Sequence, residues 1–155
     1  MSKKIDFKKL SVHAAPKKSP GFLLWHISIS WRSSIEAVLK TMNLTHPQFV
    51  VLATLGWLIR DGDLVTQTAI GKMAGLDPNT TSQILKGLEQ KNLVERMPSS
   101  DGRAKNPFLT SQGKKILNRS LPAVEKIDAK FFNTLTAQEM NSLIAAFQKL
   151  IPEQL

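Results

Sequence analysis

The sequence of 155 residues predicts a mainly α-helical protein that carries one small β-hairpin. Apolar residues recur at intervals of three and four over most of the chain, which is the spacing of amphipathic helices. Serine, threonine or aspartate stands directly before most of these segments, as expected for helix N-caps. Residues 93–97 and 104–109 each have the character of a strand, and a polar loop lies between them. The predicted order is helix, helix, short strand, helix, helix, hairpin, helix, helix.

Two long helices are expected in the first part of the chain. Residues 1–18 are basic and weakly apolar, which suggests an arm or a short extra helix. Ser19-Pro20 has the pattern of an N-cap followed by proline in the first turn, and the amphipathic helix behind it runs to about residue 41. Thr45 opens a capping box, after which residues 49–59 are apolar nearly all round and favour a buried helix.

The middle of the chain predicts a helix-turn-helix followed by a wing. Residues 64–65 are interpreted as one very short strand. A helix is expected over 67–74 and a second over 78–91, with a break at Gly75 between them. Asn92 is suited to end the second helix in the left-handed conformation. Two short helices joined by a turn of about four residues form a helix-turn-helix, and a hairpin directly behind it is a wing.

Two further helices are expected after the hairpin. Thr110 is placed to cap a helix that runs through residue 132. Thr136 and Glu139 form a second capping box, and the apolar residues from there to Leu150 share one helical face.

The charge distribution favours a polyanionic partner. The net charge is +9, and residues 1–20 alone carry six lysines and one acid, whereas residues 120–155 carry three basic and four acidic residues. Nucleic acid is the commonest partner for such a surface, and simple solubility is the alternative. The absence of cysteine excludes disulfides and thiolate zinc sites. No apolar run is long enough to span a membrane and no secretory signal is recognised, so we expect a cytoplasmic, nucleoid-associated protein.

The second helix of the motif carries a polar face suited to reading DNA. At about 100° per residue, the aliphatic side chains fall on one arc. The opposite arc carries amide, hydroxyl and ammonium groups and no carboxylate, from Asn79, Ser82, Gln83, Lys86 and Gln90. Amides bond adenine edges and lysine bonds guanine or phosphate, whereas an acid would be repelled by the phosphates. The alternative is an ordinary solvated helix face.

Thr80 and Thr81 lie at the start of the same helix, where backbone N–H groups and the helix dipole suit a phosphate. A threonine near a helix start is also often a simple cap, so both interpretations stand at this point.

The loop of the hairpin contains Asp101-Gly102-Arg103. The planar guanidinium of Arg103 suits a narrow, electronegative minor groove, and Asp101 is placed to hold its direction in a bidentate pair. Gly102 leaves the backbone free to adopt a positive φ. Lys105 and Arg96 are expected to reach the flanking phosphates. The alternative is a plain solubilising loop.

The stretches "LDPNTTSQILKGLEQKNLVER" and "SDGRAKNPFLTSQGKKIL" resemble the recognition helix and wing of the multiple antibiotic resistance regulator (MarR) family. The likeness to its winged-helix core runs from Leu44 to Leu117. It implies a homodimeric transcriptional regulator that binds a pseudo-palindromic operator. By this correspondence the major groove would meet Ser82, Gln83 and Lys86, and the wing tip would be Asp101 and Arg103.

The resemblance also implies the domain organisation. Residues 44–110 would form the DNA-binding lobe, and residues 19–43 with 111–155 the helical dimerisation lobe. Residues 1–18 would be a basic extension beyond the family's usual start, which either adds dimer contacts or touches DNA. Asn92 replaces the family's usual glycine and also tolerates the left-handed conformation. Pro107 interrupts the return strand, so we expect that strand to be short or bulged.

Catalysis is not expected. The three histidines, His13, His26 and His46, are not spaced as metal ligands and have no neighbouring acid that suggests a triad. There is no glycine-rich loop to cradle phosphates. We therefore expect no enzyme activity, no metal and no cofactor.

A small-molecule site is a further expectation from the resemblance, because the family often binds aromatic or phenolic anions between its two lobes. Tryptophan for stacking, together with histidine or arginine as a cationic partner, is available on the helices that should border this crevice, at Trp25, His26, His46, Trp57 and Arg60. Each of these residues is about as well explained by a structural role. Such an effector would release the DNA, and repression is favoured over activation. The alternative function is a winged-helix protein-interaction module without operator binding.

Overall fold

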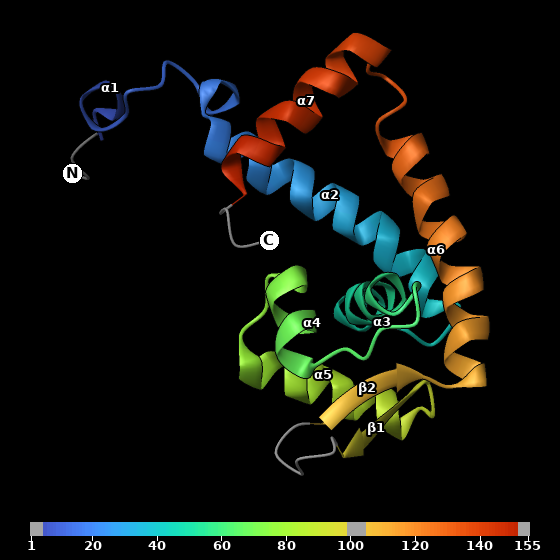
Figure 1. Ribbon diagram of the computed structural model, residues 1–155. Helices are drawn as coiled ribbons and strands as arrows, with labels where there is room; N and C mark the ends of the chain where they lie inside the picture. The colour runs from blue at the N-terminus through green and yellow to red at the C-terminus, as the bar shows by residue number, and fades with distance from the viewer. Residues whose placement is uncertain (1–4, 99–104, 152–155) are drawn as a thin grey trace.

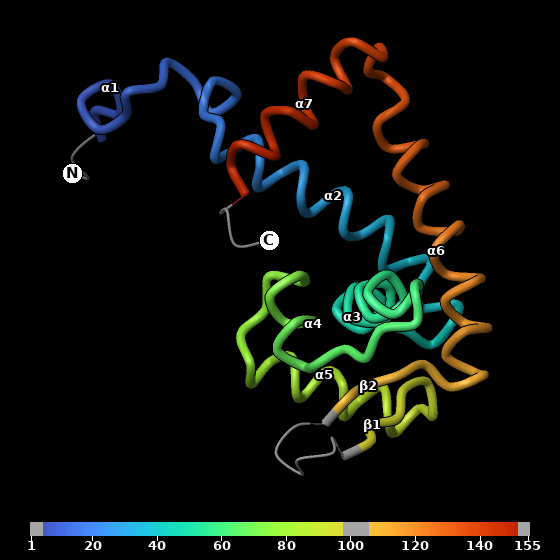
Figure 2. The backbone as a smooth tube through the Cα atoms, viewed as in Figure 1, coloured from blue at the N-terminus to red at the C-terminus, as the bar shows by residue number. Residues whose placement is uncertain are grey.

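Helix α3 (His46–Leu58) lies at the centre of the fold, with the other elements arranged around it (Figure 1). The structure is a computed structural model, and it describes residues 5–98 and 105–151. Around α3 lie the remaining long elements: α2 (Pro20–Lys40), α4 (Gln67–Ala74), α5 (Pro78–Gln90), the strands β1 (Val94–Pro98) and β2 (Lys105–Leu109), and α6 (Ser111–Phe131). The backbone trace shows α7 (Ala137–Leu150) and the short N-terminal elements α1 (Phe7–Leu10) and η1 (Pro16–Lys18) beyond this group (Figure 2).

The mainly helical fold with one small wing is therefore confirmed, and the local signals for helix ends are confirmed with it. Each predicted cap side chain accepts a hydrogen bond from a backbone N–H in the first turn of its helix: Ser19, Thr45, Thr66, Asp77, Thr110 and Thr136. Thr45 and Thr136 both form complete capping boxes. Gly75 and Asn92 have φ values of +66° and +55° and stop α4 and α5 as expected.

The core is built where α3 meets the amphipathic faces of its neighbours. Its fully buried apolar side chains come from four helices and one strand: Ile35, Leu39, Val51, Leu52, Leu55, Ile70, Leu85, Leu88 and Val94. This explains why residues 49–59 are apolar on most sides, because α3 packs on α2, α4, α5, α6 and β2. The prediction of a buried helix is confirmed for its inner faces, although Trp57 remains 56% exposed.

The first half of α2 and the whole of α7 are packed differently. Every residue from 20 to 30 is exposed, although Phe22, Trp25 and Ile27 are among them. Helix α7 buries no side chain, and its apolar residues Phe147 and Leu150 are 41% and 77% exposed. These two segments lie in the upper part of the view, away from α4, α5 and the strands (Figure 1). No helix in the described ranges is long and apolar enough to cross a membrane.

One expectation about strands is wrong, and of the two alternatives at Pro107 the bulge is not found. Residues 64–65 form no strand, and the sheet within the described residues is the antiparallel ribbon of β1 and β2. The ribbon runs in continuous register from Val94 opposite Leu109 to Pro98 opposite Lys105, with Pro107 paired to Arg96 and no bulge. A two-stranded ribbon leaves one edge of each strand unpaired, and proline is tolerated where its nitrogen faces that edge.

The base of the wing is joined tightly to the start of α6. The Thr110 hydroxyl donates to the Asn92 carbonyl oxygen at 2.7 Å and accepts from the Gly113 N–H at 2.9 Å. The Thr110 N–H donates to the Leu93 carbonyl oxygen at 3.2 Å. A Cβ atom at Gly113 would lie 1.9 Å from that same oxygen, so only glycine permits this approach.

We expect Gly113→Ala to lower the free energy of unfolding by about 1–3 kcal/mol or more, because the added methyl group meets backbone rather than a movable side chain. Gly21→Ala is the matched control, since nothing lies within 4 Å of its added Cβ. That control should be neutral or slightly stabilising. Chemical denaturation of both variants measures the difference, and equal stabilities would contradict the close approach.

Candidate nucleic-acid interface

The outward face of α5 presents the polar groups that the sequence places there. Asn79, Gln83 and Lys86 are exposed, and Ser82 is half-buried. The opposite face packs into the core through Leu85 and Leu88. Figure 1 shows α5 and the ribbon together on the side of the molecule opposite α7. The side chains left on the exposed face of α5 are therefore hydrogen-bonding and cationic groups suited to base edges and phosphates.

The start of α5 differs from the expected phosphate site. The Asp77 carboxylate accepts both the N–H and the hydroxyl of Thr80, at 2.9 and 2.5 Å. These bonds lower the pKa of Asp77, so a charged carboxylate already occupies the helix start. Thr81 is fully buried, its hydroxyl donates to the Asp77 carbonyl oxygen, and it packs against Gly71. The structure thus favours capping for Thr80 and interior packing for Thr81 over phosphate binding.

Arg96 also departs from its expected position. Its side chain on β1 is only 13% exposed and forms an ion pair with Glu89 of α5. A second bond runs from its Nη1 to the Gln67 side chain, 3.3 Å away in the first turn of α4. The hydrogen bond to Glu89 holds the pKa of Arg96 above its usual value. The guanidinium thus connects the wing to both helices of the helix-turn-helix, through Glu89 and Gln67.

The wing tip is not covered by these observations. Asp101, Gly102 and Arg103 lie outside the described residues. Lys105 is described only as the first residue of β2, opposite Pro98. Their proposed DNA contacts stay predictions.

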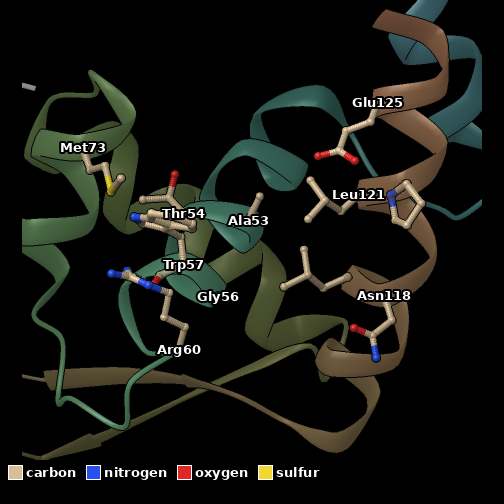
Figure 3. Close-up of a pocket in the computed structure, with 11 residues that line it drawn as sticks. Ala53, Thr54, Gly56, Trp57, Arg60, Met73, Asn118, Leu121 and Glu125 are labelled. Atoms are coloured by element: carbon tan, nitrogen blue, oxygen red, sulfur yellow. Dashed lines mark hydrogen bonds between the residues drawn. The ribbon is translucent and has the colours of Figure 1, made fainter. Parts of the chain in front are cut away.

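A pocket of about 580 Å³ lies between α3, α4 and α6 (Figure 3). It is lined by Ala53, Thr54, Gly56, Trp57, Arg60, Met73, Leu117, Asn118, Leu121, Pro122 and Glu125. Trp57 and Arg60 are the two candidate ligand residues among them. The Arg60 guanidinium lies 4.1 Å from the centre of the Trp57 ring, a cation–π geometry.

The other three candidates lie elsewhere. Trp25 and His26 are on the exposed first half of α2, where the His26 ring contacts Phe22 with centroids 4.4 Å apart. His46 packs edge-on against Trp31 at 5.1 Å, and burial, followed by the nearby charge of Arg32, lowers its pKa. The structure does not bring the five residues into one site.

The wall that α6 contributes was not predicted. Leu117, Leu121 and Glu125 line the pocket from successive turns of this helix. Their spacing of four places them on one helical face, and that periodicity was the available signal. A small residue on α3 was the complementary signal, because Ala53 lines the cavity opposite this face, whereas Gly56 allows the Leu117 side chain to pack close to the α3 backbone.

Comparison with known proteins adds the family. Residues 44–105 match the model of the MarR family. The HTH-type transcriptional regulator YdcH of Bacillus subtilis, itself uncharacterised, is 32% identical over 145 residues, which span 93% of this chain and 97% of that protein. The chain belongs to the MarR family.

Solved structures of MarR-family proteins have the same fold. CouR from Rhodococcus jostii RHA1, bound to p-coumaroyl-CoA, superposes with a TM-score of 0.78 at 20% identity, covering 89% of this chain and 95% of that one. A MarR variant from E. coli in complex with operator DNA gives a TM-score of 0.75 at 25% identity, covering 85% and 93% of the two chains. The relatives are transcriptional regulators, and this chain shares their winged-helix architecture.

The different environments of Lys86 and Arg96 predict different salt dependences of DNA binding. Lys86→Ala should lower the slope of log affinity against log salt by about one, because a phosphate contact is lost. Arg96→Ala should leave that slope unchanged and lower the free energy of unfolding by about 1–3 kcal/mol, because Glu89 and Gln67 lose their partner. Fluorescence-anisotropy titrations on duplex DNA at several salt concentrations, with thermal melts, measure both effects. A reduced slope for Arg96→Ala would show that this arginine reaches phosphate.

Proposed function

We propose that this MarR-family protein is a sequence-specific DNA-binding repressor that binds a pseudo-palindromic operator as a homodimer. The observation that carries the proposal is the exposed face of α5, where Asn79, Gln83 and Lys86 present amide and ammonium groups. The Asp77 carboxylate at the start of this helix is bonded to Thr80. The one acid of this helix, Glu89, is paired with Arg96. Two such helices would enter successive major grooves about one helical turn apart.

The wing completes the proposed interface. Arg103 would enter the minor groove beside the site that α5 reads, with Asp101 directing its guanidinium and Lys105 meeting a phosphate. Support comes from the regular ribbon register of β1 and β2, which lie on the same side of the molecule as α5 (Figure 1). Repression would follow from occupancy of the operator, which blocks polymerase.

The exposed apolar side chains of α2 and α7 support the homodimer. Phe22, Trp25, Phe147 and Leu150 are all large and at least 41% exposed in the isolated chain. Several large exposed apolar side chains on neighbouring segments are typical of an interaction site when they form one patch. A second copy that offers the same two helices would bury it symmetrically.

The pocket between α3 and α6 supports release of DNA by a small aromatic effector. Trp57 offers a stacking surface, and the volume of about 580 Å³ is in the range of ligand sites. CouR, which shares the fold, binds an aromatic acyl thioester. Helix α6 begins directly after β2, so a ligand that displaces α6 would also move the wing.

The base-reading role predicts a local change of sequence preference. We expect Gln83→Ala to relax discrimination at one operator position by about 1–3 kcal/mol, because one amide contact to a base edge is lost. The operator is first selected from a random duplex library with the wild-type protein, and single-base variants are then titrated. Gln138→Ala, an exposed position on α7, is the control and should leave every preference unchanged. Equal weakening at all positions would contradict base reading by Gln83.

The dimer predicts that a charge on α7 dissociates the protein. Phe147→Asp should shift the molecule from dimer to monomer and abolish tight operator binding, because a carboxylate would be buried between two copies. Phe147→Leu keeps an apolar side chain and should remain dimeric. Sedimentation equilibrium distinguishes the two states. A dimeric Phe147→Asp protein would show that assembly uses another surface.

A further inference from the structure

The pocket between α3 and α6 is lined by one cation, Arg60, and one carboxylate, Glu125, and only the cation has a partner of opposite charge among the described residues. Arg60 is the one cation among its lining residues. Its Nη1 donates to the Trp57 carbonyl oxygen at 2.7 Å, and its Nη2 lies 3.1 Å from the carboxylate of Asp61, which is outside the pocket lining. Figure 3 shows the guanidinium against the Trp57 side and directed away from α6. The positive charge therefore already has a counterion and a stacking partner.

Glu125 on α6 is in the opposite situation. Its carboxylate points toward the cavity from the α6 wall (Figure 3). On a helix, the neighbours that can reach a side chain lie three and four positions away, and here they are Leu121, Pro122, Asp128 and Ala129, none of them basic. The ion pairs found among residues 5–98 and 105–151 do not include Glu125. Asp128 accepts a hydrogen bond from Trp31, so a second carboxylate lies close along the same helix.

The space between these two ends is largely apolar. Trp57, Met73 and Ala53 line it together with Leu117 and Leu121 of α6. A carboxylate ligand seated among these side chains would bring a negative charge toward Glu125. At the other end of the pocket, the guanidinium of Arg60 is already paired with Asp61. Among the described residues no ion pair includes Glu125, so a protonated amine would supply a counterion to it. Charge-assisted bonds of this kind are among the stronger polar contacts.

We propose that this pocket binds a small aromatic cation, with the aromatic ring against Trp57 and a protonated amine against Glu125. The inference rests on the proposed function, in which occupancy of the pocket releases DNA, and it specifies the chemical class of the effector. Arg60 then serves to hold the indole of Trp57 in place and does not bind an acidic group of the ligand.

The test uses isothermal titration calorimetry on the full-length protein with three probes of similar size, one positively charged, one neutral and one negatively charged. They are 2-(1-naphthyl)ethylamine, its neutral alcohol analogue 2-(1-naphthyl)ethanol, and 1-naphthaleneacetate. The amine should bind about fivefold or more tightly than the alcohol, because Glu125 is exposed at the rim and the pair is partly solvated. The carboxylate should bind least tightly of the three.

Variants at Glu125 identify the group that recognises the charge. Glu125→Gln should remove the preference for the amine over the alcohol and leave the affinity for the alcohol unchanged, because the shape of the wall is preserved. Glu95→Gln is the matched control, since Glu95 is an exposed acid on β1 outside the pocket. It should retain the preference.

Two results would overturn the inference: tighter binding of 1-naphthaleneacetate than of the amine, or an amine preference that survives Glu125→Gln. Absence of heat from all three probes would remove the pocket as an aromatic site altogether. None of these outcomes affects operator binding by the unliganded protein. Failure of the proposed function is recognised separately, as failure of the wild-type protein to enrich any sequence from the duplex library.

Discussion

The contact between Gly113 and the Leu93 carbonyl oxygen is the constraint on which the arrangement of the lobes depends. Thr110 bonds to Asn92, Leu93 and Gly113, so the end of α5, the base of the ribbon and the start of α6 meet in one hydrogen-bonded junction. No side chain longer than hydrogen fits between α6 and the strand. Helix α6 also forms one wall of the pocket, so the pocket wall and the base of the wing are joined through this junction.

The charge pattern of the α5 face depends on pairings made behind it. Glu89 is held by Arg96 across the base of the wing. At the same C-terminal end of α5, Lys91 donates to the Asn43 carbonyl oxygen and to Gln48, at 2.6 and 2.8 Å. These contacts attach the end of α5 to the ribbon and to the start of α3. Glu89 and Lys91 are thus used within the fold, while the amide, hydroxyl and ammonium groups of Asn79, Gln83, Ser82 and Lys86 remain on the outward face.

Sequence alone predicted those features that depend on neighbouring residues. Thr45 and Thr136 close capping boxes within four residues, and Asn92 needs only its own tolerance of positive φ. Arg96 could not be placed in this way, because helical and strand periodicity do not show that its side chain folds back onto Glu89 and Gln67. Only one wall of the pocket was predicted. Trp57 and Arg60 come from α3 and the turn behind it, whereas the wall formed by α6 lies about sixty residues further along the chain. Contacts of that range depend on how helices pack, which local patterns do not encode.

The exposed surface of α7 bears on stability through the proposed homodimer. Helix α7 has no buried side chain within its own chain, so in that dimer a second molecule would cover it and mass action would enter the folding equilibrium. At low copy number the covered form would become scarce, and the upper helices would lose their packing before the core around α3 does. For a regulator, the number of copies in the cell would then determine more than the fraction of operators that are bound. It would also determine how long each newly made chain is exposed to proteases before it forms a dimer.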